Sequence, residues 1–295
     1  MTTTTTFQVS FPRRESSVPT TIVRTEPLAQ DSYAVMTACT PFHPVDFTWP
    51  DQPADHGTMT VGSLTLDVAD CVTGAIHKTD GQLLIGDSIT IRKSDEHWSF
   101  VVVHLFENCT NPELLKPGTQ VTLEIDAHYQ QQLSLGHTAC HLSAMALNRA
   151  AAPFWRKQPL RRDALDSPDF DQMAIFSSKI QPGGSRDHYR LGKTIRKKGL
   201  RSEEVIKDLP QLMSATEQQV NNWLALESQL YIECEGRALT DRRFWHCDLG
   251  EDGKAVIPCG GTHARSLKEL GAVRVSAEPI SDNEFVMVTE VIGPQ

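Results

Sequence analysis

Residues 128–151 of this chain read HYQQQLSLGHTACHLSAMALNRAA, and Pro153 follows shortly after. No helix breaker stands between His137 and Ala152, so this stretch predicts a helix that the proline limits. Within it, His137 and His141 are four residues apart, a spacing that puts both imidazoles on one helix face with Cβ atoms about 6 Å apart. Two imidazoles at that separation are able to share one metal ion.

A second segment, Pro258–His263 (PCGGTH), supplies matching ligand types far along the chain. Its proline and glycines predict a tight loop that brings a thiol and an imidazole toward one centre. Thiolate sulfur and imidazole nitrogen are ligands that Zn²⁺ takes in tetrahedral sites. We therefore expect Zn²⁺ as the cofactor. The expected ligands are His137, His141, Cys259 and His263. Spacing alone leaves open a structural or a catalytic zinc.

Other motifs in the sequence give weaker or no support for a metal or nucleotide site. Cys39 and His43 have the same spacing as Cys259 and His263, but Pro41 and Pro44 prevent a helix there, and an extended chain would separate the two side chains by about 13 Å. No Glu follows His137, so the HExxH pattern of metalloproteases is missing. Walker A and dinucleotide-binding glycine patterns are also missing, which disfavours nucleotide hydrolysis and hydride transfer.

The remaining pattern predicts an α+β protein. From residue 33 to about 126, short apolar runs alternate with glycines and turns, which predicts a small β-barrel-like domain. Helical stretches, one of them interrupted at Pro210, and later strand-like segments predict a second domain of the α+β class. We expect a flexible lead (1–30), the β-barrel-like domain (31–127) and an α+β domain with the zinc site (128–295).

Composition limits the function classes. The 295 residues are 39% hydrophobic with a net charge of −9, and no apolar run approaches the roughly 20 residues of a membrane-spanning helix. Seven cysteines, an odd number, and a start without an apolar signal core predict a reducing, cytoplasmic location and no membrane partner.

Positive charge gathers between residues 156 and 201, which hold twelve Lys and Arg against five Asp. A basic segment in an acidic chain attracts phosphates locally and repels them elsewhere, although a solvated basic face has the same composition. The candidate nucleic-acid contacts are Lys157, Arg161, Arg162, Arg190, Lys193, Arg196, Lys197 and Lys198.

These motifs resemble a known family, the editing domain of alanyl-tRNA synthetase and the AlaX-type trans-editing proteins. HTACH (137–141) is similar to the family's HTATH, and CGGTHARSLKELG (259–271) is similar to its CGGTH-x-x-x-x-x-E-x-G motif. TPFHP (40–44) with QPADHG (52–57) resembles the family's N-terminal segment, so the resemblance covers residue 32 to the C-terminus. It also accounts for Cys39 and His43 without a second metal site.

The resemblance implies an editing domain in the C-terminal half and a zinc-dependent hydrolase of mischarged aminoacyl-tRNA, typically seryl- or glycyl-tRNA of alanine identity. The counterparts of the two His and of Cys259 and His263 hold zinc, while Thr138, Gly260 and Gly261 would shape the catalytic pocket. Because the 295 residues contain no synthetase core, editing in trans is implied.

The chain also departs from the family pattern. Residues 45–51 replace an expected glycine-rich triplet, and a basic segment follows the HTACH helix where the family has a short connection. Two alternatives therefore stay open. One is a hydrolase for a non-protein aminoacyl-tRNA or a small ester or amide, and the other is a non-catalytic tRNA-binding module with structural zinc.

Overall fold

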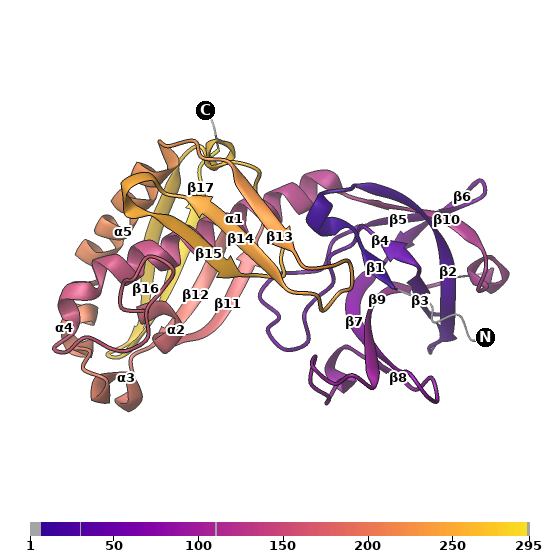
Figure 1. Ribbon diagram of the computed structural model, residues 1–295, viewed down its shortest axis with the longest axis horizontal. Helices are drawn as coiled ribbons and strands as arrows, with labels where there is room; N and C mark the ends of the chain where they lie inside the picture. Colours follow the sequence, from indigo (N-terminus) through magenta and orange to yellow (C-terminus); the bar gives the residue numbers. More distant parts are fainter. Residues whose placement is uncertain (1–6, 30, 110, 294–295) are drawn as a thin grey trace. The chain divides into compact units, whose positions relative to one another are not determined.

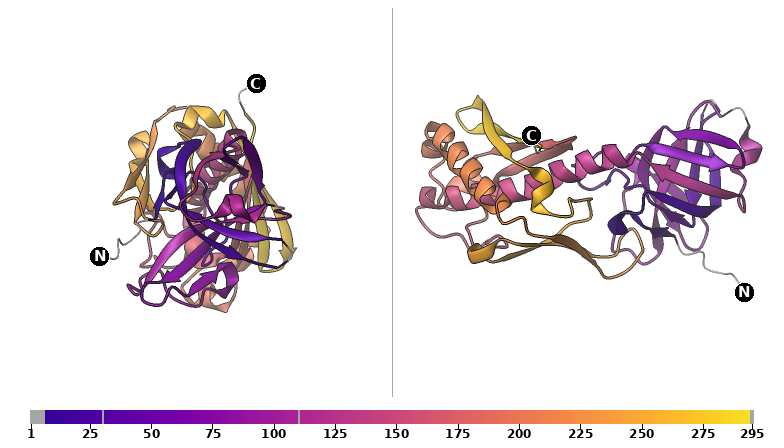
Figure 2. Two further views of the ribbon diagram at one scale, coloured as in Figure 1. Left: turned by 90° about the vertical axis from the view of Figure 1, so that its right-hand side faces the viewer. Right: turned by 90° about the horizontal axis from the view of Figure 1, so that it is seen from above.

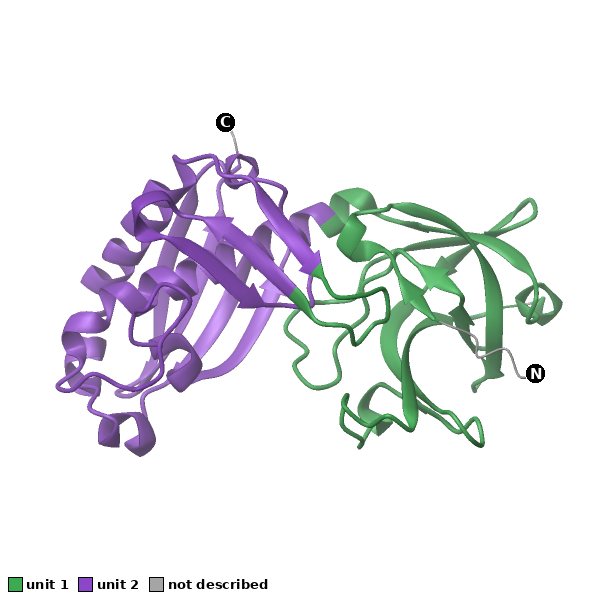
Figure 3. Ribbon diagram, in the orientation of Figure 1, with its two compact units in different colours: residues 1–130, 234–243 green, residues 131–233, 244–295 purple. Residues whose placement is uncertain are grey.

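A computed structural model describes residues 7–29, 31–109 and 111–293 of the chain (Figure 1). The fold is mixed α/β, with several sheets and few long helices. Two compact units divide it (Figure 3): unit 1 holds the described residues up to 130 together with 234–243, and unit 2 holds 131–233 with the described residues from 244 onward. The chain thus leaves unit 2, contributes one segment to unit 1, and returns.

Unit 1 is built around an eight-stranded antiparallel sheet in the order β6-β5-β10-β2-β3-β9-β7-β8. Its strands are β2 (Ser17–Pro27), β3 (Tyr33–Thr37), β5 (Gly57–Val61), β6 (Leu64–Val68), β7 (Asp70–His77), β8 (Leu83–Ile85), β9 (Trp98–Phe106) and β10 (Gln120–Ile125). A short parallel pair joins β1 (Gln8–Val9) to β4 (Cys39–Thr40). The hydrogen-bonded order of the described strands ends at β6 and β8, so a closed barrel stays a prediction.

The expected flexible lead needs correction. Residues 1–6 and 30 lie outside the described residues, but β2 occupies the interior of the sheet between β10 and β3. Val18, Thr20 and Ile22 are all buried, which is the period-two alternation of β-branched residues that a half-buried strand requires. The abundance of Thr, Ser and Pro in this region pointed to disorder, and the alternation outweighs it.

Unit 2 combines helices with two sheets. Its helices are α1 (Ala127–Ala150, whose first turn belongs to unit 1), α2 (Phe170–Ala174), α3 (Lys193–Lys197), α4 (Ser202–Lys207) and α5 (Leu209–Leu224). A four-stranded sheet has the order β11 (Ile175–Gln181), β12 (Gly184–Arg190), β17 (Glu284–Val291), β16 (Val273–Ser281), and a three-stranded sheet has the order β13 (Leu230–Cys234), β14 (Arg243–Asp248), β15 (Lys254–Pro258). Pro210 stands in the first turn of α5 and separates it from α4, as the sequence predicted.

In the described part of the chain, six short 3-10 helices connect these elements. They are η1 (Phe11–Arg13), η2 (Gly86–Ser88), η3 (Pro112–Leu115), η4 (Ala152–Phe154), η5 (Gly250–Asp252) and η6 (Leu267–Leu270). None of the described helices is both long enough and apolar enough to cross a lipid bilayer.

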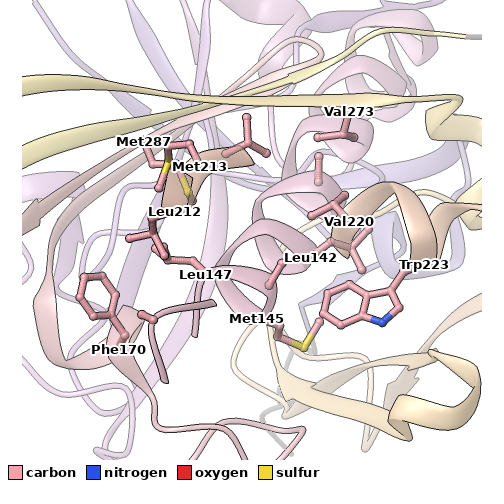
Figure 4. Packing of buried hydrophobic residues seen from close by; sticks show 14 of the residues in the cluster. Leu142, Met145, Leu147, Phe170, Leu212, Met213, Val220, Trp223, Val273 and Met287 are labelled. Carbon is pink, nitrogen blue, oxygen red and sulfur yellow. The ribbon is translucent and has the colours of Figure 1, made fainter. Parts of the chain in front are cut away.

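The core of unit 2 lies between the long helices and the four-stranded sheet. Leu142 and Met145 of α1 belong to one buried cluster with Trp223 of α5 and Met287 of β17 (Figure 4). Helix α1 runs along the sheet (Figures 1 and 2) and lies in close backbone contact with it at Gly136. A Cβ at that position would stand 2.5 Å from the carbonyl oxygens of Gln181 and Gly184, so only glycine permits this contact. The contact positions the next residue, His137.

Candidate metal centre

One turn of α1 presents the first two candidate ligands. The rings of His137 and His141 are stacked with centroids 5.0 Å apart and planes 14° apart. This is the geometry that the i, i+4 spacing predicts for one helix face. The helix is fixed by its packing on the sheet, so the two imidazoles are held in place before any ligand arrives.

The loop after β15 brings the other two candidates to the same place. Cys259 follows directly after Pro258, the last residue of the strand, and its Sγ lies 3.5 Å from Nε2 of His137. Nε2 of His263 lies 3.2 Å from the same sulfur. The sequence expectation that two distant segments meet is therefore met in the structure.

Four potential donor atoms, one each from His137, His141, Cys259 and His263, all lie within 4.8 Å of one another. For Zn²⁺ with its usual bond lengths, a tetrahedron has nitrogen–nitrogen edges of about 3.3 Å and nitrogen–sulfur edges of about 3.6 Å. The two sulfur–nitrogen distances are close to these values, and a contraction of the widest separation by about 1 Å or somewhat more would complete the shell. The donor set fits a metal ion with the softness of zinc.

His141 contributes a buried ring nitrogen to the group. Its Nε2 is buried and has no hydrogen-bond partner among the described residues. Burial lowers the pKa of His141 to about 4, so the ring is neutral near pH 7 and keeps an unprotonated nitrogen. A buried polar atom without a partner is destabilising, and a bound cation would compensate it.

Thr138 holds the ring of His263, the fourth candidate ligand, in position. Its fully buried Oγ1 donates to the carbonyl of Ser134 at 2.8 Å, accepts the N–H of Ala264 at 3.0 Å, and lies 3.2 Å from Nδ1 of His263. Because the hydroxyl proton is committed to Ser134, the favourable contact with His263 is one in which Nδ1–H donates. That tautomer leaves Nε2 of His263 unprotonated toward the cysteine.

Trp245 of β14 forms one wall of the centre and was not identified from the sequence. Its ring is fully buried, stacks on His141 at 5.4 Å, and lies 5.8 Å from His263. Buried and half-buried residues alternate along β14, with Trp245 among the buried ones, but no sequence signal distinguishes a tryptophan beside a metal centre from any other core tryptophan.

The glycines of the loop differ in their surroundings. Gly260 is exposed, and a Cβ there would meet no atom within 4 Å, so space is open beside the cysteine. Gly261 is buried. Neither glycine has the positive φ that would make it obligatory for the backbone.

Cys140 of the same helix does not join the four-residue group. Its Sγ lies 3.6 Å from both carboxylate oxygens of Asp187, which also accept from Ser178 and Ser185. Burial raises the pKa of Asp187 to about 6. Among the described residues, Cys39 and His43 belong to no group of three or more potential metal ligands.

The eight candidate nucleic-acid contacts fall into two sets. Arg161 pairs with Asp169, Arg162 donates to the carbonyl of Asp166, and Arg190 pairs with Glu284 while stacking 3.3 Å over the ring of Phe176. Lys157, Lys193, Arg196, Lys197 and Lys198 are exposed. The structure thus brings the first three to partners within the protein and leaves the other five facing solvent.

Comparison with known proteins gives one partial similarity. No protein-family model matches the chain. An alanine–tRNA ligase of Akkermansia muciniphila is 27% identical over 185 residues, which cover 56% of this chain and 16% of the ligase. The similarity is distant and spans a small part of the ligase, and it supports a domain related to alanyl-tRNA synthetase within this chain.

Proposed function

We propose that this chain is a zinc-dependent hydrolase that removes the amino acid from mischarged aminoacyl-tRNA and acts in trans. The observation that carries the proposal is the convergence of four donor atoms within 4.8 Å, from a helix and a loop more than a hundred residues apart. The partial similarity to an alanine–tRNA ligase supports tRNA as the partner. The substrate proposed is seryl- or glycyl-tRNA of alanine identity, as the resemblance of the HTACH and CGGTH motifs to the editing domain implies. A cytoplasmic location is compatible with this partner and stays a prediction.

Zinc would be held by His137, His141, Cys259 and His263. When bound there, it would supply a positive centre able to polarise an ester carbonyl or a water molecule. With a single thiolate, the zinc site would keep a net positive charge. The metal would then be more electrophilic than in a site with two or four thiolates, which favours this role.

The protein's own groups would position and shield the reaction. Thr138 fixes the ring of His263 through Nδ1, and Trp245 covers one side of the imidazoles and keeps water away from them. The open space beside Gly260 supports placing the ester next to the cysteine, with Gly261 forming the buried part of the loop. An aminoacyl ester is activated, so a positioned water and stabilisation of the oxyanion are sufficient and no helix carboxylate is required.

A second candidate function follows from the number of donors. Four protein ligands fill a tetrahedral shell, which is typical of structural zinc, whereas catalytic zinc keeps one position for water or substrate. Under this alternative the chain would bind tRNA without hydrolysing it. A hydrolase for a non-protein aminoacyl-tRNA or a small ester or amide is the remaining alternative.

Incubation of the purified protein with a panel of mischarged tRNAs, before and after chelation, tests the proposal. We expect release of serine or glycine from the tRNA, loss of release after chelation, and recovery on addition of Zn²⁺. His141→Ala and Cys259→Ala should lower bound zinc, measured by elemental analysis, together with hydrolysis.

His128→Ala and Cys234→Ala are matched controls, since both residues are exposed and neither belongs to the four-residue group. The controls should keep zinc content and hydrolysis. Full hydrolysis by metal-free protein would overturn the proposal. Bound zinc and tRNA without turnover would favour the structural alternative, and turnover of small esters alone would favour the other hydrolase.

A further inference from the structure

A group of unpaired cations lies on unit 2 apart from the metal centre. Within the part of the chain that the structure describes, none of its members has an acidic partner at ion-pair distance. All of them are exposed. We call this group the α3 basic surface, and it consists of Arg156, Lys157, Lys193, Arg196, Lys197 and Lys198.

Backbone pairing joins the two parts of this surface. Trp155 and Leu200 form an isolated antiparallel bridge, and the N–H of Arg156 donates to the carbonyl of Gly199 at 2.9 Å. Residues 156 and 157 are thereby held beside the end of α3, forty residues later in the sequence. The bridge residues Trp155 and Leu200 are themselves buried, so the pairing is anchored in the core.

Gly199 allows Lys157 to lie across it. Its φ is +111°, a conformation that residues with a side chain rarely adopt, and a Cβ there would stand 2.7 Å from Cγ of Lys157. The stem of the lysine therefore occupies the space above the glycine. This contact places its ammonium group with the cations of the helix.

Helix α3 is anchored through one residue only. Ile195 is 1% exposed, while the basic residues on either side of it face solvent. The helix thus presents its charges outward from a fixed base. Six like charges without counter-charges repel one another, and a polyanion would relieve this repulsion.

The surface is too far from the metal centre to touch the same chemical group. Helix α1 leads from His137 to Ala150, which corresponds to about 20 Å of helix, and the bridge at Trp155 follows five residues later in the chain. A ligand that reaches both places must be long and carry its negative charges away from its reacting end. The acceptor arm of tRNA has this arrangement, with the ester at the 3′ end and phosphates along the arm.

We propose that the α3 basic surface docks the phosphates of the tRNA acceptor arm while the ester reaches the metal centre. The choice of tRNA rests on the proposed function. Arg161, Arg162 and Arg190, which the sequence also suggested, are excluded from this surface because they already have partners within the protein. Arg156, absent from the sequence-based set, is included.

The triple variant Lys193→Ala, Lys197→Ala and Lys198→Ala tests this surface, because alanine preserves α3 while the charges are removed. Binding of an uncharged tRNA(Ala) transcript is measured over a series of salt concentrations. We expect the slope of log affinity against log salt to decrease by about 3, and affinity near physiological salt to fall roughly 10- to 100-fold. KM for mischarged tRNA should rise with kcat unchanged, and hydrolysis of aminoacyl-adenosine, which lacks the arm, should not change.

The matched control is Lys254→Ala, Lys268→Ala and Arg274→Ala, which removes the same charge from exposed positions of unit 2 that pair with acidic residues. Affinity and slope unchanged in the triple variant, or an equal loss in the control, would overturn the docking surface. Binding and slope are read without turnover. A protein that hydrolyses no ester would therefore contradict the proposed function and leave this measurement valid.

Discussion

Oγ1 of Thr138 lies 3.2 Å from Nδ1 of His263 and also accepts the N–H of Ala264. Replacement by valine keeps the shape but removes the hydroxyl, so the N–H of Ala264 loses its partner and His263 loses the group that fixes its tautomer. We expect Thr138→Val to weaken zinc binding about 10- to 100-fold. Competition with a chromogenic chelator measures this affinity.

Thr138→Ser is the matched variant, because it restores the hydroxyl without the methyl group. It should recover most of the affinity for zinc. If valine and serine variants bind zinc equally well, the hydroxyl does not position His263.

Zinc should raise the free energy of unfolding by binding the four-residue group that includes His141. At zinc concentrations about 100-fold above the dissociation constant, ligand binding adds about 2.7 kcal/mol to the free energy of unfolding. For a unit of this size that corresponds to a rise in Tm of roughly 5–10 °C. Differential scanning calorimetry with and without Zn²⁺ should show the rise in the wild type and in His128→Ala. The same rise in His141→Ala would contradict the assignment of His141.

Asp55 predicts a pH dependence of stability in unit 1. Its carboxyl group is buried, accepts from the N–H of His43 and from Gln130, and burial raises its pKa to about 7. The folded state therefore binds this proton more tightly than the unfolded state. Binding of this proton adds to the free energy of unfolding. The added stability is complete below the unfolded pKa near 4 and is lost as pH rises through about 7. In that window the free energy of unfolding falls by up to about 1.4 kcal/mol per pH unit.

Asp55→Asn should remove this contribution, because the amide does not titrate. Urea unfolding at several pH values between 4 and 8 measures it. As pH rises across that window, the free energy of unfolding of the wild type should fall relative to that of the variant. If the difference does not depend on pH, the pKa of Asp55 in the folded state is close to its ordinary value and the prediction is wrong.

Gly136→Ala should destabilise unit 2, although alanine is the better helix former by about 1 kcal/mol. The new methyl group would meet backbone atoms of Gln181 and Gly184, which cannot rotate away. We expect a net loss of at least about 1 kcal/mol in urea unfolding. Gln131→Ala, an exposed position of the same helix, should stay within about 0.5 kcal/mol of the wild type. If the Gly136→Ala variant is more stable than the wild type, α1 and the hairpin of β11 and β12 must be able to move apart at little cost.

The sequence predicted the helix that carries His137 and His141 because an uninterrupted run of helix formers leaves few alternatives. It predicted the meeting with the Cys259 loop because ligand type and resemblance both pointed there. Within the stretch from 33 to 126, where short apolar runs predicted strands, Cys71, Thr73 and Ala75 of β7 alternate inward, whereas the apolar run at residues 89–91 forms no strand. In short apolar runs, tertiary pairing decides between strand and loop.

Pairing between charges was also beyond the sequence. Arg161 and Arg190 could not be separated from Lys197 by residue type, because their partners Asp169 and Glu284 are chosen by the fold. The role of Thr138 was expected at the pocket wall, whereas the structure gives it hydrogen bonds to Ser134, His263 and Ala264. Contacts of this kind depend on distances of a few tenths of an ångström that no residue pattern encodes.

The excursion of residues 234–243 into unit 1 limits how the protein can be dissected. There the carbonyl of Arg237 accepts the N–H of Val9, and the guanidinium of Arg243 lies 5.2 Å from the ring centroid of Phe11. A fragment cut after residue 130 would lack these contacts, and a fragment starting at 131 would carry the excursion as an unsupported hairpin tip. A minimal metal-binding fragment therefore calls for a short engineered turn between β13 and β14, rather than simple truncation.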